Sequence, residues 1–318
     1  MAITLPLGIL RDPEPPDHLV WQRTTVEGRS ALYGVAGEGL PVVFLHGWGL
    51  AQHAYKRALK RLVQLDCRVY APAMPGFGGT PDLPREHFSF EGYAYWVDRF
   101  LEAVGLDEPA FVIGHSFGGA VAIKLAHDHP DRVRTLVLVN SIGGSAWTSA
   151  TGGSGRSMSE RPLWDWGIHF PRDLLDPARI TRVLPVVLED AVSNVVRNPK
   201  ALWKVANLVR QADLTGELEE LKQRKLPVVV LWGDKDGIVP RASFDALCAA
   251  IGSEGEVVGG SHSWLLADPD AFGEVMTNVI AVARLARETA AQEAAAQEGG
   301  GGNVRPKRRG LRRLLPGA

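Results

Sequence analysis

Short apolar runs separated by amphipathic stretches predict alternating strands and helices in the first half of the chain. Three runs, at 41–45, 109–113 and 133–140, are apolar enough to be strands covered on both faces. Between them, 55–63 and 90–104 repeat apolar residues at helical spacing. Because helices separate successive strands, the sheet should be largely parallel.

Further elements are expected on either side of this region. They are strands at 19–25, 30–35, 68–71, 226–232 and 256–258, a helix at 240–250 and a closing helix from 269. The alternation stops between 143 and 221, where no strand-like run occurs and a Gly/Ser-rich loop precedes helical patterns rich in Trp, Leu and Val. The predicted parts are an α/β core (1–142 and 222–298), an inserted helical cap (143–221) and a tail (299–318).

Composition narrows the class of protein without setting its chemistry. The chain is 45% hydrophobic and 22% charged with a net charge of −1, which is typical of a globular domain and predicts no nucleic-acid partner. Cys67 and Cys248 form no spacing pattern and are expected to be small core residues. The first ten residues lack a basic leader, and no apolar run approaches the roughly 20 residues of a membrane-spanning helix. We therefore expect a cytoplasmic protein without stable membrane insertion.

The tail has a different character. Residues 304–318 contain six Lys or Arg side chains and no acidic one, interspersed with three leucines. A solvated, disordered tail is the favoured interpretation. The alternative is weak contact between this basic segment and an anionic surface.

The segment that organises the chain is Gly114-His115-Ser116-Phe117-Gly118, between a predicted buried strand and a helix. It fits the Gly-x-Ser-x-Gly elbow, in which a strained turn lifts a serine hydroxyl clear of a sheet edge. Glycines are needed there because a side chain would crowd the neighbouring backbone. Ser116 is therefore the candidate nucleophile, provided that a base and an acid follow it in the chain.

One histidine lies after the predicted cap. His262 follows the last strand, so its loop should reach the sheet edge that carries the serine. An acid could follow the strand ending near 139, but Asn140 and Ser141 carry no charge. The next strand is followed by Asp234 and Asp236. We favour Asp236 as the acid, because it lies deeper in its loop, and interpret Asp234 as a turn residue.

An oxyanion formed during acyl transfer needs two backbone N–H groups fixed in advance. Phe117 directly follows the serine at the start of its helix and offers one N–H group. The loop after the strand at 41–45 should offer the other, most plausibly from Trp48 in His46-Gly47-Trp48-Gly49. His46 is then expected to hold this loop rather than to act as the base.

Taken together, these segments resemble the α/β-hydrolase superfamily, of the capped serine esterase and C–C hydrolase type. The motifs that carry the resemblance are His46-Gly47-Trp48-Gly49, Pro75-Gly76-Phe77-Gly78, Gly114–Gly119, Gly233-Asp234-Lys235-Asp236 and Ser261-His262. Relatives often have Asp where this chain has Ala73, so the support of that turn differs here. Relatives that act through an aspartate nucleophile, the haloalkane dehalogenases and epoxide hydrolases, are disfavoured by Ser116.

Three functions compete at this point. The favoured one is a cofactor-free serine hydrolase that cleaves an ester or related acyl bond of a small, largely apolar substrate. The alternatives are a C–C bond hydrolase of ring-cleavage products with the same triad, and a non-catalytic ligand-binding protein of this fold. No residue cluster has metal-ligand spacing, and no cofactor is implied. Trp147, Trp164 and Trp166 of the cap are candidate pocket residues, or alternatively hold the cap together.

Overall fold

The computed structural model describes residues 18–144, 146–147, 156–157, 190, 192, 194 and 196–299 of the 318-residue chain. The chain divides into two compact units, Met1–Thr277 and Asn278–Ala318. The described part of the second unit is the C-terminal portion of one long helix, α10, which runs from Pro269 to Gly299. The sheet, the elbow and the candidate site all lie in the first unit.

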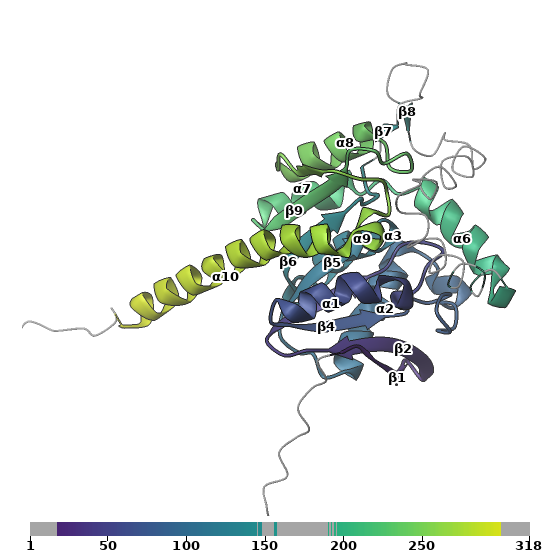
Figure 1. The fold of residues 1–318 in the computed structure, drawn as a ribbon, viewed down its shortest axis with the longest axis horizontal. Coiled ribbons are helices and arrows are strands. Elements are labelled where there is room, and N and C mark those ends of the chain that lie inside the picture. The colour runs from purple at the N-terminus through teal and green to yellow at the C-terminus, as the bar shows by residue number, and fades with distance from the viewer. Residues whose placement is uncertain are drawn as a thin grey trace, which may run out of the picture. The chain divides into compact units, whose positions relative to one another are not determined.

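An eight-stranded sheet forms the centre of the first unit, in the order β1-β2-β4-β3-β5-β6-β9-β10 (Figure 1). The strands are β1 Val20–Val26, β2 Arg29–Ala36, β3 Leu40–Leu45, β4 Cys67–Pro72, β5 Ala110–His115, β6 Val133–Val139, β9 Val228–Gly233 and β10 Glu256–Val258. β1 pairs with β2 and β2 with β4 in antiparallel fashion, whereas all pairs from β4 to β10 are parallel. The predicted, mostly parallel α/β sheet is confirmed.

Burial along the strands follows their place in the sheet. β3 and β5 are buried at every position, which agrees with their uninterrupted apolar sequences. β1, at one edge, is mostly exposed along its length, and its middle residues, Gln22 to Thr25, are all polar. The central parallel strands therefore form the buried part of the sheet. In sheets of this kind, active sites lie in the loops at the carboxyl ends of such strands.

Helices flank the sheet. Those described are η1 Gln52–Tyr55, α1 Lys56–Gln64, η2 Arg85–His87, α2 Phe90–Ala103, α3 Phe117–Asp128, η3 Pro130–Arg132, α6 Pro199–Arg210, α7 Thr215–Gln223, α8 Arg241–Ile251, α9 Trp264–Ala267 and α10. α2, α3, α7 and α8 pack against one another in that order, while α1 contacts α9. Within the described part of the chain, no helix is both long and apolar enough to cross a membrane.

The segment between β6 and β9 differs from the sequence expectation in one detail. It contains a two-residue antiparallel ribbon, β7 Ala146–Trp147 with β8 Arg156–Ser157, where no strand was predicted. A pairing of two residues is too short to leave a periodic pattern, so the sequence could not reveal it. Asn198 caps α6 through its side chain, with Pro199 at the first helical position.

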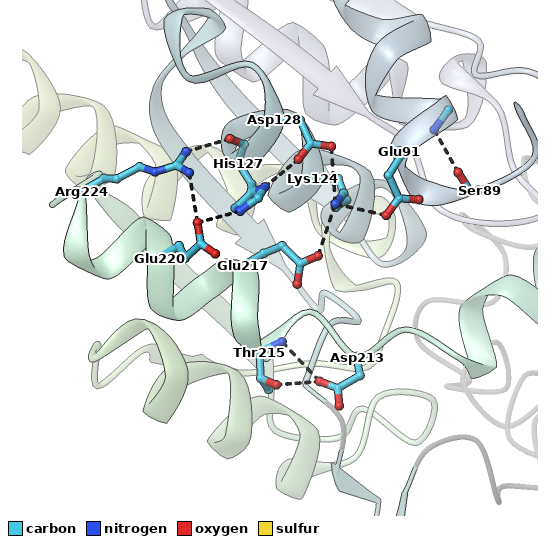
Figure 2. Close-up of polar contacts among 11 residues, drawn as sticks. Ser89, Glu91, Lys124, His127, Asp128, Asp213, Thr215, Glu217, Glu220 and Arg224 are labelled. Atoms are coloured by element: carbon cyan, nitrogen blue, oxygen red, sulfur yellow. Dashed lines mark hydrogen bonds and ion pairs between the residues drawn. The ribbon is translucent and has the colours of Figure 1, made fainter.

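A polar network connects α7, the helix at the end of the inserted segment, to the elbow helix α3 (Figure 2). The largely buried Lys124 of α3 pairs with Glu217 of α7 at 3.3 Å and with Glu91 of α2 at 3.1 Å. On the outer side, His127 Nε2 lies 3.0 Å from Glu220 of α7. These contacts connect the helix that follows the elbow to the end of the inserted segment.

Candidate functional site

Ser116 occupies a sharp turn between β5 and α3. Its backbone angles are φ 54° and ψ −118°, a conformation that side-chain-bearing residues rarely adopt. A Cβ added at Gly118 would lie 2.2 Å from the Leu45 carbonyl oxygen, and one at Gly114 would lie 2.5 Å from that of Gly118. Any larger residue would therefore push the elbow away from the end of β3. The predicted turn thus lies against the end of β3, and the loop that follows β3, which carries the predicted oxyanion donor Trp48, is called the oxyanion loop below.

Asp236 and His262 meet beside this elbow. The loop after β9 carries Asp236 and the loop after β10 carries His262, and His262 Nδ1 lies 2.8 Å from Asp236 Oδ2. Both side chains are almost inaccessible to solvent. The Nδ1–H group donates to the carboxylate, which leaves Nε2 of a neutral imidazole as an acceptor for a proton.

Backbone groups hold the carboxylate in place from the other side. Asp236 Oδ1 accepts hydrogen bonds from the N–H groups of Ile238, at 2.7 Å, and Val239, at 2.8 Å. These two bonds fix the orientation of the carboxylate. Asp234 instead accepts from Gly260 N at 2.8 Å and so ties the two loops together. Of the two acids that the sequence offered, Asp236 is the one that the structure pairs with His262.

Asn140 supports the same carboxylate, a role that the sequence did not suggest. Its Nδ2 donates to Asp236 Oδ2 at 2.6 Å, and its Oδ1 accepts from the Trp264 indole N–H at 2.7 Å. An amide carries no charge, so the sequence excludes Asn140 as the acid without indicating a supporting role. Its position directly after β6, at the same sheet edge, was the available signal.

A chain of hydrogen bonds runs beneath the elbow from the oxyanion loop to the histidine loop. Gly47 N donates to the Tyr55 hydroxyl at 3.0 Å, and that hydroxyl lies 2.8 Å from His115 Nδ1. His115 Nε2 lies 3.0 Å from the carbonyl oxygen of His262. A carbonyl can only accept, so Nε2 carries the proton, and the Tyr55 hydroxyl donates to Nδ1.

His115 and His46 are neutral members of the site. Burial, together with the smaller effect of the neighbouring His262, lowers the pKa of His115 to about 3. Burial likewise lowers the pKa of His46 to about 4. His46 Nδ1–H donates to the Gly47 carbonyl, and its Nε2 accepts from Met74 N at 2.9 Å. His46 thus joins the oxyanion loop to the turn after β4, in agreement with the structural role expected for it.

The oxyanion loop and the start of α3 face each other. Phe117 begins α3 directly after Ser116, and Trp48 follows Gly47 in the loop after β3. The Trp48 indole Nε1 donates to the Leu202 carbonyl of α6 at 3.0 Å. The side chain of Trp48 is therefore attached to the inserted segment, while its backbone belongs to the core.

The candidate pocket tryptophans are not placed by the structure. Trp164 and Trp166 lie outside the described residues, and for Trp147 only the backbone, in β7, is described. Trp203, on α6, is 64% exposed. Across the described ranges, no three His, Cys, Asp or Glu side chains are grouped so that they could hold a metal ion.

Residues 41–269 match the family described as the alpha/beta hydrolase fold. The chain belongs to the α/β-hydrolase family. A pimeloyl-[acyl-carrier protein] methyl ester esterase from Aromatoleum aromaticum is 31% identical to this hydrolase over 66% of the chain and 85% of the relative. A poly(3-hydroxyalkanoate) depolymerase from Ectopseudomonas oleovorans is 25% identical, over 66% of the chain and 74% of the relative.

A solved structure shares the fold at lower identity. The meta-cleavage product hydrolase from Pseudomonas fluorescens IP01 aligns with a TM-score of 0.62 at 22% identity, over 82% of this chain and 98% of that one. At this identity the likeness extends to the fold alone. Its match over most of the chain agrees with the family assignment.

Proposed function

We propose that this α/β hydrolase is a serine hydrolase that cleaves an ester of a small, largely apolar acid. The observation that carries the proposal is the Asp236–His262 hydrogen bond at 2.8 Å beside the strained turn of Ser116. An unactivated serine is a weak nucleophile, and an oriented imidazole is the usual means of activating it. The methyl ester esterase among the relatives supports an ester as the substrate class.

In the proposed reaction, Ser116 Oγ attacks the ester carbonyl carbon and His262 Nε2 takes the hydroxyl proton. The carbonyl oxygen becomes an oxyanion, stabilised by the N–H groups of Trp48 and Phe117. The C–O bond to the alcohol then breaks, and the leaving alkoxide takes the proton from His262. Water, deprotonated by His262, cleaves the resulting acyl-enzyme and regenerates Ser116.

Asp236 keeps His262 in the required tautomer and stabilises the imidazolium that forms. The residues that hold it, Asn140, Ile238 and Val239, satisfy the carboxylate from three directions. We further propose that the segment 143–221, as a cap, shapes the acyl pocket and that Trp147, Trp164 and Trp166 contribute to it. This division assigns the chemistry to the core and the substrate preference to the insertion.

A fluorophosphonate probe tests the nucleophile, because it phosphonylates activated serines. The wild type should be labelled once, and Ser116→Ala should lose both the label and the hydrolysis of p-nitrophenyl butyrate. Ser141→Ala, which changes a neighbouring buried hydroxyl, is the matched control and should still be labelled. Labelling that survives in Ser116→Ala would overturn the assignment.

The bond that is cleaved needs a second measurement, since C–C hydrolases of ring-cleavage products can share this triad. A panel of p-nitrophenyl esters and a vinylogous dienoate diketone should show turnover of the esters by wild type and none by Ser116→Ala. Faster turnover of the diketone than of any ester would favour C–C bond hydrolysis. Labelling without turnover of either class would favour a ligand-binding protein.

A further inference from the structure

The oxyanion loop is held from outside the core, by the inserted segment. Residues 48–51, which follow β3, belong to no helix or strand. The next turn, η1, begins at Gln52, and its N-cap residue is Ala51, whose methyl side chain cannot cap it. Asp190 replaces the missing cap: its Oδ2 accepts from Ala51 N at 3.2 Å and from Ala54 N at 3.1 Å. One carboxylate from the insertion therefore fixes the end of this loop.

Asn194 holds the same loop one helical turn further along the insertion. Its Nδ2 donates to the Gly49 carbonyl at 3.1 Å, and its Oδ1 accepts from Gly78 N at 3.0 Å. Asn194 is 4% exposed, so both bonds are shielded from water. Gly49 has φ +78°, which places a change of backbone direction next to Trp48. The amide thus joins the loops after β3 and β4.

Three contacts from the inserted segment therefore hold the surroundings of Trp48. Asp190 and Asn194 bind the backbone of residues that follow Trp48 in the chain, and the Leu202 carbonyl accepts from the Trp48 indole N–H. A rigid connection of this kind matters most for an N–H group that must be in place before charge develops. The core contributes Gly47, which is bonded to Tyr55, on the other side of Trp48. The backbone before Trp48 is therefore held by the core, and the backbone after it is held by the inserted segment.

We propose that Asp190 and Asn194 are positioning residues for the oxyanion hole, through which the inserted segment sets the orientation of the Trp48 N–H group. The inference rests on the proposed function, because only a reaction that passes through an oxyanion requires that orientation. Loss of either side chain lets the loop move, which weakens binding of the oxyanion more than binding of the ground-state ester. The rival view is that both residues merely attach the insertion to the core.

Kinetics with a small substrate separate these two roles. With p-nitrophenyl acetate, whose acetyl group makes little contact with a cap, Asp190→Ala and Asn194→Ala should lower kcat roughly 10–100-fold and leave KM within about threefold. Asp190→Asn keeps an acceptor oxygen and should recover most of the loss. An attachment role predicts unchanged kcat on the acetate, with a higher KM for longer acyl chains.

A transition-state analogue gives an independent measurement. A methyl trifluoromethyl ketone forms a hemiketal oxyanion with an activated serine, so its inhibition constant should rise by the same factor as kcat/KM falls. Asp213→Ala is the matched control, since Asp213 is an exposed carboxylate that accepts from the backbone N–H of Thr215 at the start of α7 (Figure 2). It should leave kcat and inhibition at the wild-type values.

The outcomes distinguish this inference from the proposed function. A wild-type protein with neither labelling nor ester turnover would refute the serine-hydrolase proposal itself. An active wild type with Asp190→Ala and Asn194→Ala at wild-type kcat and inhibition would refute the positioning role alone. Loss of turnover without weaker inhibition would also refute it, because the oxyanion site would then be intact. Circular dichroism and melting temperature show which variants are folded.

Discussion

The two halves of the candidate site are built in different ways. The acid–base half, Asp236 and His262, is held by neighbouring loops of the same sheet edge, and each of its supports comes from the core. The oxyanion half, around Trp48, takes three of its attachments from the inserted segment. The carboxylate of Asp236 is thus held by groups of the core, whereas the backbone that follows Trp48 is held by side chains of the segment between β6 and β9.

The two halves are joined beneath the elbow. Gly47, Tyr55 and His115 form an unbroken set of hydrogen bonds that ends on the carbonyl of His262. These hydrogen bonds connect the loop after β3 to the loop of His262. Substitutions in the two halves and in their connection should therefore reduce turnover to different extents.

Asp236→Asn should have the largest effect, because it disables the half built by the core. The amide would turn an N–H group toward His262 Nδ1 and favour the wrong tautomer, with turnover falling by up to about 10⁴-fold. Asp234→Asn, which alters only the contact with Gly260, should lose far less. The measurement is kcat/KM for p-nitrophenyl butyrate on variants with wild-type circular dichroism. A greater loss in Asp234→Asn would assign the acid to the other carboxylate.

Asn140→Ala should have an intermediate effect and tests the supports of that half. It removes one donor to the carboxylate and leaves the Trp264 indole N–H without its partner. A hydrogen bond to a charged group contributes about 1.5–3 kcal/mol, so kcat/KM should fall roughly 10–100-fold. Asn207→Ala, which removes an exposed amide on α6, is the control and should be silent. Wild-type kinetics in Asn140→Ala would mean that the backbone donors suffice.

His115→Gln should have the smallest effect at neutral pH and tests the connection between the halves. Glutamine can donate to the His262 carbonyl and accept from Tyr55, so kcat at pH 7.5 should stay within about tenfold of wild type. The expected difference lies in the pH dependence of the free energy of unfolding. Chemical denaturation at pH 7 and pH 5 measures it.

The sign of that difference follows from the lowered pKa of His115, which is about 3 in the folded protein. An unfolded histidine has a pKa near 6.5, so below that pH the unfolded chain binds a proton that the folded protein does not. Stability is therefore complete above about pH 6.5 and falls as the pH falls toward 3. Between pH 7 and pH 5, His115→Gln should lose about 2 kcal/mol less than wild type. Equal losses would mean that His115 is protonated in the folded state.

Much of the fold was predictable because it depends on short-range features. The elbow around Ser116 needed only the glycine spacing and the apolar run before it, since steric crowding decides the turn. The mostly parallel sheet followed from the alternation of strands and helices, whereas the order of its strands was seen only in the structure. Asp236 and His262 were identified by their places after successive strands, because parallel strands bring their carboxyl ends to one edge.

The supports of the site were decided by the tertiary structure. Asp190 lies 139 residues from Ala51, and Tyr55 lies 60 residues from His115, so no local pattern links either pair. Asn140 supports the site by donating a hydrogen bond to Asp236, and no local pattern marks an uncharged residue for that role. Hydrophobic periodicity and local sterics determine where strands, turns and helices form. Which polar side chains then meet depends on how distant loops pack, and that is set only when the whole core has closed.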